Sequence, residues 1–154
     1  MPKKFAFNLQ PVLDHRKRIE DERQQVVAIR RRAHEDAKRE LERLNDEFRR
    51  YAAQLRDRHR ALTAEELRLH YAHLQYLDRA IGAQTRLVAE RRAALDRARA
   101  ELIAASKNRK VVDKLKERRR AAFVAEELRV EQIELDDGNA RRHSRAARSA
   151  GGPS

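Results

Sequence analysis

Apolar residues recur through the first 62 residues at alternating spacings of three and four, which places them on one face of an α-helix. Twelve of the sixteen positions in this series are apolar, and the other four are arginines whose alkyl stems can cover a partner helix. The series is Leu9, Val12, Arg16, Ile19, Arg23, Val26, Arg30, Ala33, Ala37, Leu41, Leu44, Phe48, Tyr51, Leu55, Arg58 and Leu62. We predict an extended lead over residues 1–10 and a coiled-coil helix over residues 11–62. Two successive steps of four around Ala37 predict a stutter that unwinds the coil locally.

A second series keeps a strict seven-residue repeat, and ten of its fourteen positions are apolar. It consists of Leu67, His70, Leu74, Leu77, Ile81, Gln84, Val88, Arg91, Leu95, Ala98, Leu102, Ala105, Arg109 and Val112. This pattern predicts a second coiled-coil helix over residues 63–137, which a glycine stop signal at Gly138 would end. Residues 138–154 contain four arginines and no acidic residue, and we expect a disordered basic tail.

Between the two series, Thr63 and Glu66 form a T-x-x-E capping box, the signature of a helix start. We therefore predict an all-α fold of two long helices in an antiparallel coiled-coil hairpin, with residue i opposite roughly residue 126 minus i. The alternative is one unbroken helix of some 125 residues, about 190 Å long at 1.5 Å per residue.

In the hairpin, the second helix is longer by roughly 20 residues, or about 30 Å. The segment 107–137 is basic in its first half and acidic in its second, with a short apolar run at 121–125 between them. Its overhanging part carries apolar residues that would be exposed, which usually marks an interaction site. These residues are Phe123, Val124, Leu128, Val130, Ile133 and Leu135. Two alternatives stay open: Phe5, Phe7 and the N-terminal lead fold back onto Phe123 and Val124, or the protein forms a dimer there.

Composition and net charge narrow the classes of function that the chain can have. Charged residues make up 40% of the chain and aromatic residues 5%, there is no cysteine, and the net charge is +12. The charge fits either a solvated arginine-rich helix surface or an acidic partner; a generic coiled-coil protein that binds nucleic acid or anionic membrane is the alternative function. Neither a basic face nor stacking aromatic residues are evident, so we expect no nucleic-acid partner. Without a signal peptide or an apolar run of membrane-spanning length, we expect a soluble cytoplasmic protein.

Motifs that would carry chemistry are absent from the sequence. It contains no glycine-rich phosphate loop and no hydroxyl residue in a nucleophile setting. His70 and His73 are three apart on the second helix, a spacing that can hold a metal, but no obvious third ligand accompanies them beyond Glu66 and Asp78. We predict no enzyme, with no catalytic residue, no cofactor and no metal site.

Three segments nevertheless resemble one family. FAFNLQPVLDHR at 5–16 resembles the F-x-F-x-L-x-x-V-L-x-x-R opening of the FliJ family, a coiled-coil component of the bacterial flagellar type III export apparatus. KVVDKLKERRRAAFVAEELRVEQIELDD at 110–137 looks like the C-terminal signature of that family, and 71–84 is similar to its Y-x-x-L-x-x-L-x-x-A-I pattern. The likeness covers residues 5–137.

This resemblance implies an antiparallel coiled coil similar to the stalk of the rotary-ATPase gamma subunit. It implies binding to the hexameric export ATPase near the central hole of the ring, with stimulation of its activity, and contact with export chaperones. It also implies contact with the cytoplasmic domain of the export-gate membrane protein, and hence a peripheral position on the cytoplasmic face of the inner membrane.

The resemblance also assigns candidate contact residues. Those expected to contact the ATPase are Phe5, Leu9, Leu115, Arg118, Phe123, Leu128, Glu131 and Gln132. Those matching the export-gate surface are Leu44, Tyr51, Leu77, Ala80 and Gln84, several of which also lie on the predicted helix–helix seam. His73 stands where the family can carry Phe, a departure from the pattern.

Overall fold

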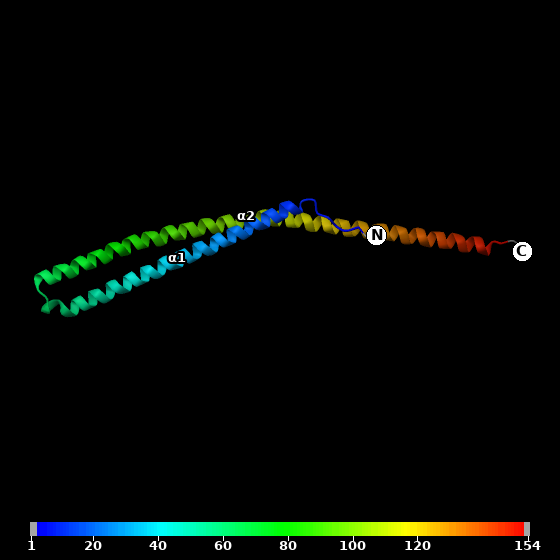
Figure 1. The fold of residues 1–154 in the computed structure, drawn as a ribbon. Coiled ribbons are helices and arrows are strands. Elements are labelled where there is room, and N and C mark those ends of the chain that lie inside the picture. Colours follow the sequence, from blue (N-terminus) through cyan, green and yellow to red (C-terminus); the bar gives the residue numbers. More distant parts are fainter. Residues whose placement is uncertain (1–2, 153–154) are drawn as a thin grey trace. The chain divides into compact units, whose positions relative to one another are not determined.

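A computed structural model describes residues 3–152 of the chain (Figure 1). Helix α1 spans Gln10–Arg58, a short 3-10 helix η1 spans His59–Ala61, and helix α2 spans Ala64–Ala150. No strand occurs among residues 3–152. The predicted class, two long helices with the second longer, is confirmed. The chain divides into two compact units. The hairpin unit is Lys17–Lys107, and the terminal unit combines Met1–Arg16 with Asn108–Ser154.

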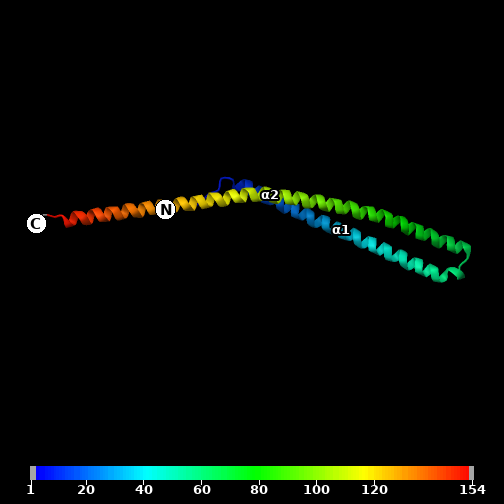
Figure 2. The same ribbon diagram turned by 180° about the vertical axis from the view of Figure 1, so that it is seen from behind.

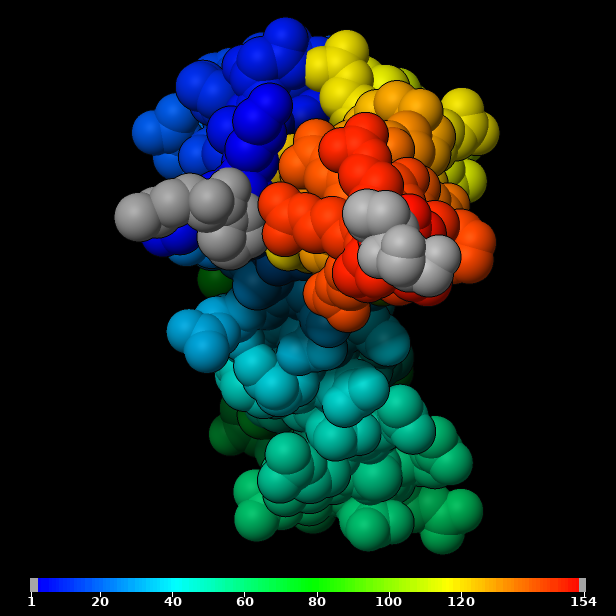
Figure 3. All heavy atoms as spheres, turned by 90° about the vertical axis from the view of Figure 1, so that its right-hand side faces the viewer, coloured from blue at the N-terminus to red at the C-terminus, as the bar shows by residue number. Residues whose placement is uncertain are grey.

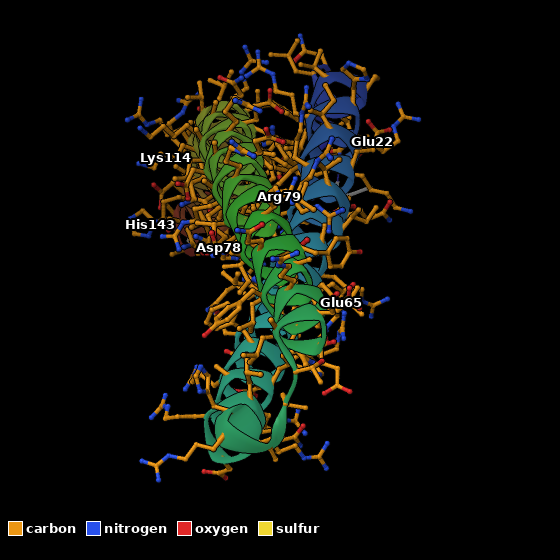
Figure 4. The ribbon with its side chains drawn as sticks, turned by 90° about the vertical axis from the view of Figure 1, so that its left-hand side faces the viewer. Glu22, Glu65, Asp78, Arg79, Lys114 and His143 are labelled. Carbon is orange, nitrogen blue, oxygen red and sulfur yellow. The ribbon has the colours of Figure 1, made fainter. Side chains whose placement is uncertain are left out.

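In the hairpin unit, α1 and α2 run antiparallel and side by side, joined by η1 (Figure 2). Contacts across the pair fix the register. Arg23 forms an ion pair with Glu101, and Arg91 donates a hydrogen bond of 2.9 Å to the Ala33 carbonyl. Both pairs lie within a few residues of the register predicted from sequence. Charged side chains such as Glu22 and Asp78 lie on the outer surface (Figure 4).

The seam predicted for α2 is correct throughout, because all fourteen of its positions are buried or half-buried. In the first part of α1, every second position of the predicted seam is displaced by one residue, whereas Leu9 and Arg16 are half-buried as predicted. Leu13 is fully buried whereas Val12 is 39% exposed. In the same way Val27 is buried in place of the predicted Val26, and His34 in place of the predicted Ala33. The buried Leu13, Val27, His34 and Leu55 are separated by multiples of seven, so α1 keeps one continuous heptad repeat without a stutter. The apolar pattern favours Ala33 over the adjacent polar His34, and a seam through Ala33 requires a stutter that a seam through His34 does not.

The turn between the helices follows the predicted capping box. The Thr63 hydroxyl accepts a hydrogen bond of 3.2 Å from the Glu66 N–H, and a Glu66 carboxylate oxygen accepts one of 3.1 Å from the Thr63 N–H. Two N–H groups that the first turn of α2 leaves without helical partners are thereby satisfied. Leu62, just before the cap, is extended, so the chain reverses between η1 and α2.

In the terminal unit, the N-terminal segment lies alongside α2; it is the blue segment against the yellow and orange part of that helix in Figure 3. Helix α1 begins where the Gln10 N–H donates to the Phe7 carbonyl, at 3.0 Å. Pro11 in the first turn costs no hydrogen bond, because an N–H there would have no helical partner. Phe7, Leu13 and Val112 form the buried core of this unit.

The prediction of a disordered tail from residue 138 is wrong for the described residues, since α2 continues to Ala150. A glycine stops a helix by adopting a positive φ, and no described glycine does so. Gly138 costs about 1 kcal/mol relative to Ala within a helix, but the alanines and arginines after it are strong helix formers. The arginines also interact favourably with the C-terminal end of the helix dipole. Residues 153 and 154 of the predicted tail lie outside the described part of the chain.

Candidate functional site

The N-terminal segment covers one side of α2 in the terminal unit. The Phe5 and Phe123 rings lie 5.7 Å apart between centroids and are tilted by 52°, a favourable arrangement for an aromatic pair. Phe5, Leu9 and Leu115 pack against the core formed by Phe7, Leu13 and Val112. Four residues predicted for the ATPase contact, namely Phe5, Leu9, Leu115 and Phe123, are therefore half-buried within the unit. Of the alternatives left open by the sequence, the fold-back is confirmed in part: Phe5 packs against Phe123, whereas Phe7 packs against Leu13 and Val112, and Val124 stays 50% exposed.

Two arginines hold this segment in place. The Arg119 guanidinium lies 5.7 Å from the centroid of the Phe7 ring and donates a hydrogen bond to the Asn8 side chain. The Arg120 guanidinium lies 5.9 Å from the centroid of the Phe5 ring. Such cation–π contacts contribute about 0.5–1 kcal/mol at exposed sites. Arg118, the neighbour predicted from sequence, is exposed.

Sequence reasoning missed Arg119 and Arg120 as functional neighbours of the N-terminal phenylalanines. The signal for Arg119 was present, because the heptad series of α2 continues beyond Val112 in alternating steps of four and three through Lys116 to Arg119 and then Phe123. Arg119 therefore continues the seam on which the N-terminal segment packs.

Beyond Phe123 the same helix keeps its apolar residues but exposes them. We name Val124, Leu128, Val130, Ile133 and Leu135 the overhang surface; each is at least 40% exposed, and Leu128 reaches 61%. At about 100° per residue, Val124, Leu128 and Leu135 form one stripe. Val130 and Ile133 lie on a second stripe that continues the heptad seam through Phe123.

Acidic residues surround the overhang surface. Glu126 accepts hydrogen bonds from Arg129 at 2.6 and 2.9 Å, which hold the pKa of its carboxyl below the ordinary value and raise the pKa of Arg129. The predicted contact residues Glu131 and Gln132 are exposed, and Gln132 donates to Asp136 at 3.1 Å. A partner that covers the two apolar stripes would meet a mostly acidic rim.

The residues predicted for the export-gate contact lie in the hairpin unit, and their side chains differ in how much of their surface is exposed. Leu44 and Leu77 are buried between the helices, Leu77 with only 1% of its surface exposed. Gln84 is half-buried and donates a hydrogen bond of 3.0 Å to the Ala37 carbonyl. Tyr51 and Ala80 are also half-buried, so part of each side chain faces solvent.

Aromatic rings form a row around Tyr51. Its hydroxyl is hydrogen-bonded to Nδ1 of His70, its ring lies 4.5 Å from the His73 ring, and His73 stacks on Tyr76 at 6.2 Å. Tyr76 is 63% exposed, so the row leads from the helix pair to the surface. His73 packs between two tyrosines, where the family pattern can carry Phe.

Two further features concern ions and membranes. Residues 3–152 contain no group of three or more His, Asp or Glu side chains arranged to hold a metal ion. Within the same residues, no helix combines the length and the apolar character needed to cross a membrane.

The paired helices, the heptad seam and the capped turn define an antiparallel coiled-coil protein with exposed apolar surface at one end of its longer helix. The chain belongs to the flagellar FliJ protein family, whose model matches residues 5–148. Its fold is similar to that of the YscO homolog CT670 from Chlamydia trachomatis, with a TM-score of 0.51 and 22% identity over 94% of this chain and 99% of that one. No curated protein matches the chain.

Proposed function

We propose that this chain binds the flagellar export ATPase through the overhang surface and raises the rate of ATP hydrolysis, without catalysing a reaction itself. Membership of the flagellar FliJ family supports a role as a component of the type III export apparatus. The observation that carries the ATPase contact is the apolar overhang surface, which contains Val124, Leu128 and Leu135 on one stripe.

The size and character of this surface fit a protein partner. Exposed apolar residues at regular helical spacing are the usual anchors of a helix that lies in a partner's groove. The stripe through Val130 and Ile133 lies on a different face from the stripe through Leu128, so a partner that encloses the helix would bury both. The central hole of a ring-shaped ATPase is such an enclosure.

The N-terminal segment has a supporting role in this proposal. Phe5, Leu9 and Leu115 stabilise the base from which the overhang extends, while Phe123 lies at the border between the covered and exposed stretches. The residues proposed to contact the ATPase directly are then Leu128, Glu131 and Gln132. Arg118, in the basic stretch before Phe123, is a further proposed contact.

Stimulation of ATP hydrolysis tests the proposal. Leu128→Asp places a charge in the centre of the exposed stripe, and we expect it to reduce the affinity for the ATPase by at least tenfold, because hot-spot residues contribute about 2 kcal/mol or more. Leu69→Asp is the matched control, since Leu69 is 73% exposed on α2 in the hairpin unit. Circular dichroism should show unchanged helix content in both variants. The proposal fails if the unaltered protein gives no stimulation over a wide concentration range, or if both variants lose it equally.

We propose a second contact, between the hairpin unit and the cytoplasmic domain of the export-gate membrane protein. Tyr51 and Ala80 are half-exposed and could be touched directly, whereas the buried Leu44 and Leu77, with Gln84, would act by keeping the two helices paired. This contact would place the protein peripherally at the cytoplasmic face of the membrane, and export chaperones would be further partners. Ala80→Glu should weaken capture of the purified gate domain while leaving the melting temperature unchanged; unaltered capture would remove Ala80 from the contact.

A further inference from the structure

The last three turns of α2 carry a stripe of arginines to which the proposed function assigns no role. Arg141, Arg145 and Arg148 are spaced i, i+4 and i+7, so they project from one face of the helix, and Arg142 flanks them. All four side chains are exposed, and no ion pair involves them within residues 3–152.

The charge of this segment has no internal compensation. From Gly138 to the end of the sequence there is no Asp and no Glu, whereas the preceding segment contains Glu134, Asp136 and Asp137. Four guanidinium groups on three helical turns make a local positive potential that attracts an anionic surface. Every basic residue here is Arg rather than Lys, apart from His143, and the planar guanidinium suits bidentate contact with phosphate oxygens.

We infer that this arginine stripe binds the phosphate headgroups of an anionic lipid membrane. The composition favours a membrane over other anionic partners. Residues 138–152 contain no large apolar side chain that could anchor a protein interface, and the imidazole of His143 is their one aromatic ring on which a nucleic-acid base could stack. Alanine, serine and glycine fill most other positions, so contact depends on charge and needs no exact complementarity of shape.

The stripe would hold the protein at the membrane reversibly. Each basic residue close to an anionic surface strengthens binding by about fivefold, so the three aligned arginines together give a factor on the order of a hundred. The attraction extends only over about 8 Å at physiological ionic strength. Asp137 lies four residues before Arg141 on the same helix face, about 6 Å along the axis, so its carboxylate weakens the attraction at that end of the stripe. The proposed function assigns no role to these arginines, and binding to lipid is measured without the ATPase, so either can fail alone.

Co-sedimentation of the full chain with lipid vesicles tests this inference. We expect binding to vesicles of phosphatidylcholine mixed with phosphatidylglycerol, none to vesicles of phosphatidylcholine alone, and a steep loss of binding with salt. The triple variant R141Q/R145Q/R148Q should lose on the order of a hundredfold in affinity. Absence of binding by the unaltered protein, or an unchanged triple variant, would overturn the inference.

A matched control separates the stripe from net charge. The triple variant R18Q/R31Q/R86Q removes the same charge from three exposed arginines of the hairpin unit and should keep vesicle binding. An equal loss in the two triple variants would mean that only total charge matters, which would overturn the inference. Asp136→Asn with Asp137→Asn should strengthen binding, because it removes repulsion beside the stripe. Tighter binding to duplex RNA that anionic vesicles do not displace would identify a nucleic-acid partner instead and overturn the inference.

Discussion

Helix α2 runs through both the hairpin unit and the overhang surface, yet the two regions use their seam positions in opposite ways. In the hairpin unit the seam tolerates polar residues, because Gln84 and Arg91 donate to carbonyls of α1 across the pair. Beyond Phe123 the seam positions Val130 and Ile133 are apolar but have 40% and 45% of their surface exposed. Apolar residues are therefore retained where no helix of the chain needs them for packing, which points to a partner from outside.

The largest effect expected from this contrast is on stability. Leu95→Ala in the hairpin unit removes a side chain that is only 2% exposed and packs with Val27 and Ala98, so it should lower the free energy of unfolding by about 2–5 kcal/mol. Leu128→Ala on the overhang surface should change it by less than about 0.5 kcal/mol. Urea unfolding followed by circular dichroism measures both. A comparable loss in Leu128→Ala would show that another surface already covers the overhang.

A second test concerns the border between the two regions, where the N-terminal segment ends the coverage of α2. Phe7→Ala removes a buried side chain and should cost about 3–5 kcal/mol of local stability, whereas Phe5→Ala also breaks the pair with Phe123 but starts from a half-buried position and should cost less. Amide hydrogen exchange across residues 108–123 measures the loss. If exchange there is unaffected by Phe7→Ala, the segment does not stabilise this part of α2.

The accuracy of the prediction from sequence differs between α1, α2 and the C-terminal end of α2. The seam of α2 followed directly from its strict repeat, and the capping box at Thr63 located the turn. The shift of one residue in α1 could not be foreseen, because adjacent residues such as Val12 and Leu13 both border the seam, and only packing decides which is buried. The predicted helix end at Gly138 was wrong because a glycine ends a helix only when it adopts a positive φ. Strong helix formers on its C-terminal side disfavour that conformation.

The candidate site was predicted in part for a related reason. Counting helix lengths and seam positions predicts the exposed Leu128 of the overhang surface, but it also predicts an exposed Phe123, which is half-buried against Phe5. Contacts between segments far apart in sequence were not predicted, because no local sequence pattern connects Asn8 with Arg119. Leu44 and Leu77 were predicted for the export-gate contact from a resemblance, which marks positions without distinguishing buried residues from exposed ones.

A smaller effect is expected where the hairpin seam is polar. Arg91→Leu should raise the free energy of unfolding by about 1 kcal/mol, because leucine adds apolar burial and the Ala33 carbonyl keeps its hydrogen bond within α1. The exposed Arg92→Leu is the control and should change stability little. Thermal unfolding measures both variants. A destabilised Arg91→Leu would mean that the cross-helix hydrogen bond outweighs the gain in apolar contact.

The smallest effect compares two equivalent ion pairs, one in each region. Arg43 in the hairpin unit and Arg129 beside the overhang surface each hydrogen-bond a glutamate three residues earlier, and this lowers the pKa of Glu40 and of Glu126. A lowered folded-state pKa contributes stability above the unfolded pKa that is lost as the pH falls through the folded value. Both pairs are exposed, so the contribution is small, but the pKa itself reports whether the helix is formed, because residues three apart meet only in a helix. Carboxyl titration followed by NMR should therefore find both pKa values lowered, and Arg43→Gln and Arg129→Gln should each restore the ordinary value of their own partner alone. If Glu126 titrates normally while Glu40 does not, the overhang is not helical by itself, and a partner would have to order the helix before it could bury the overhang surface.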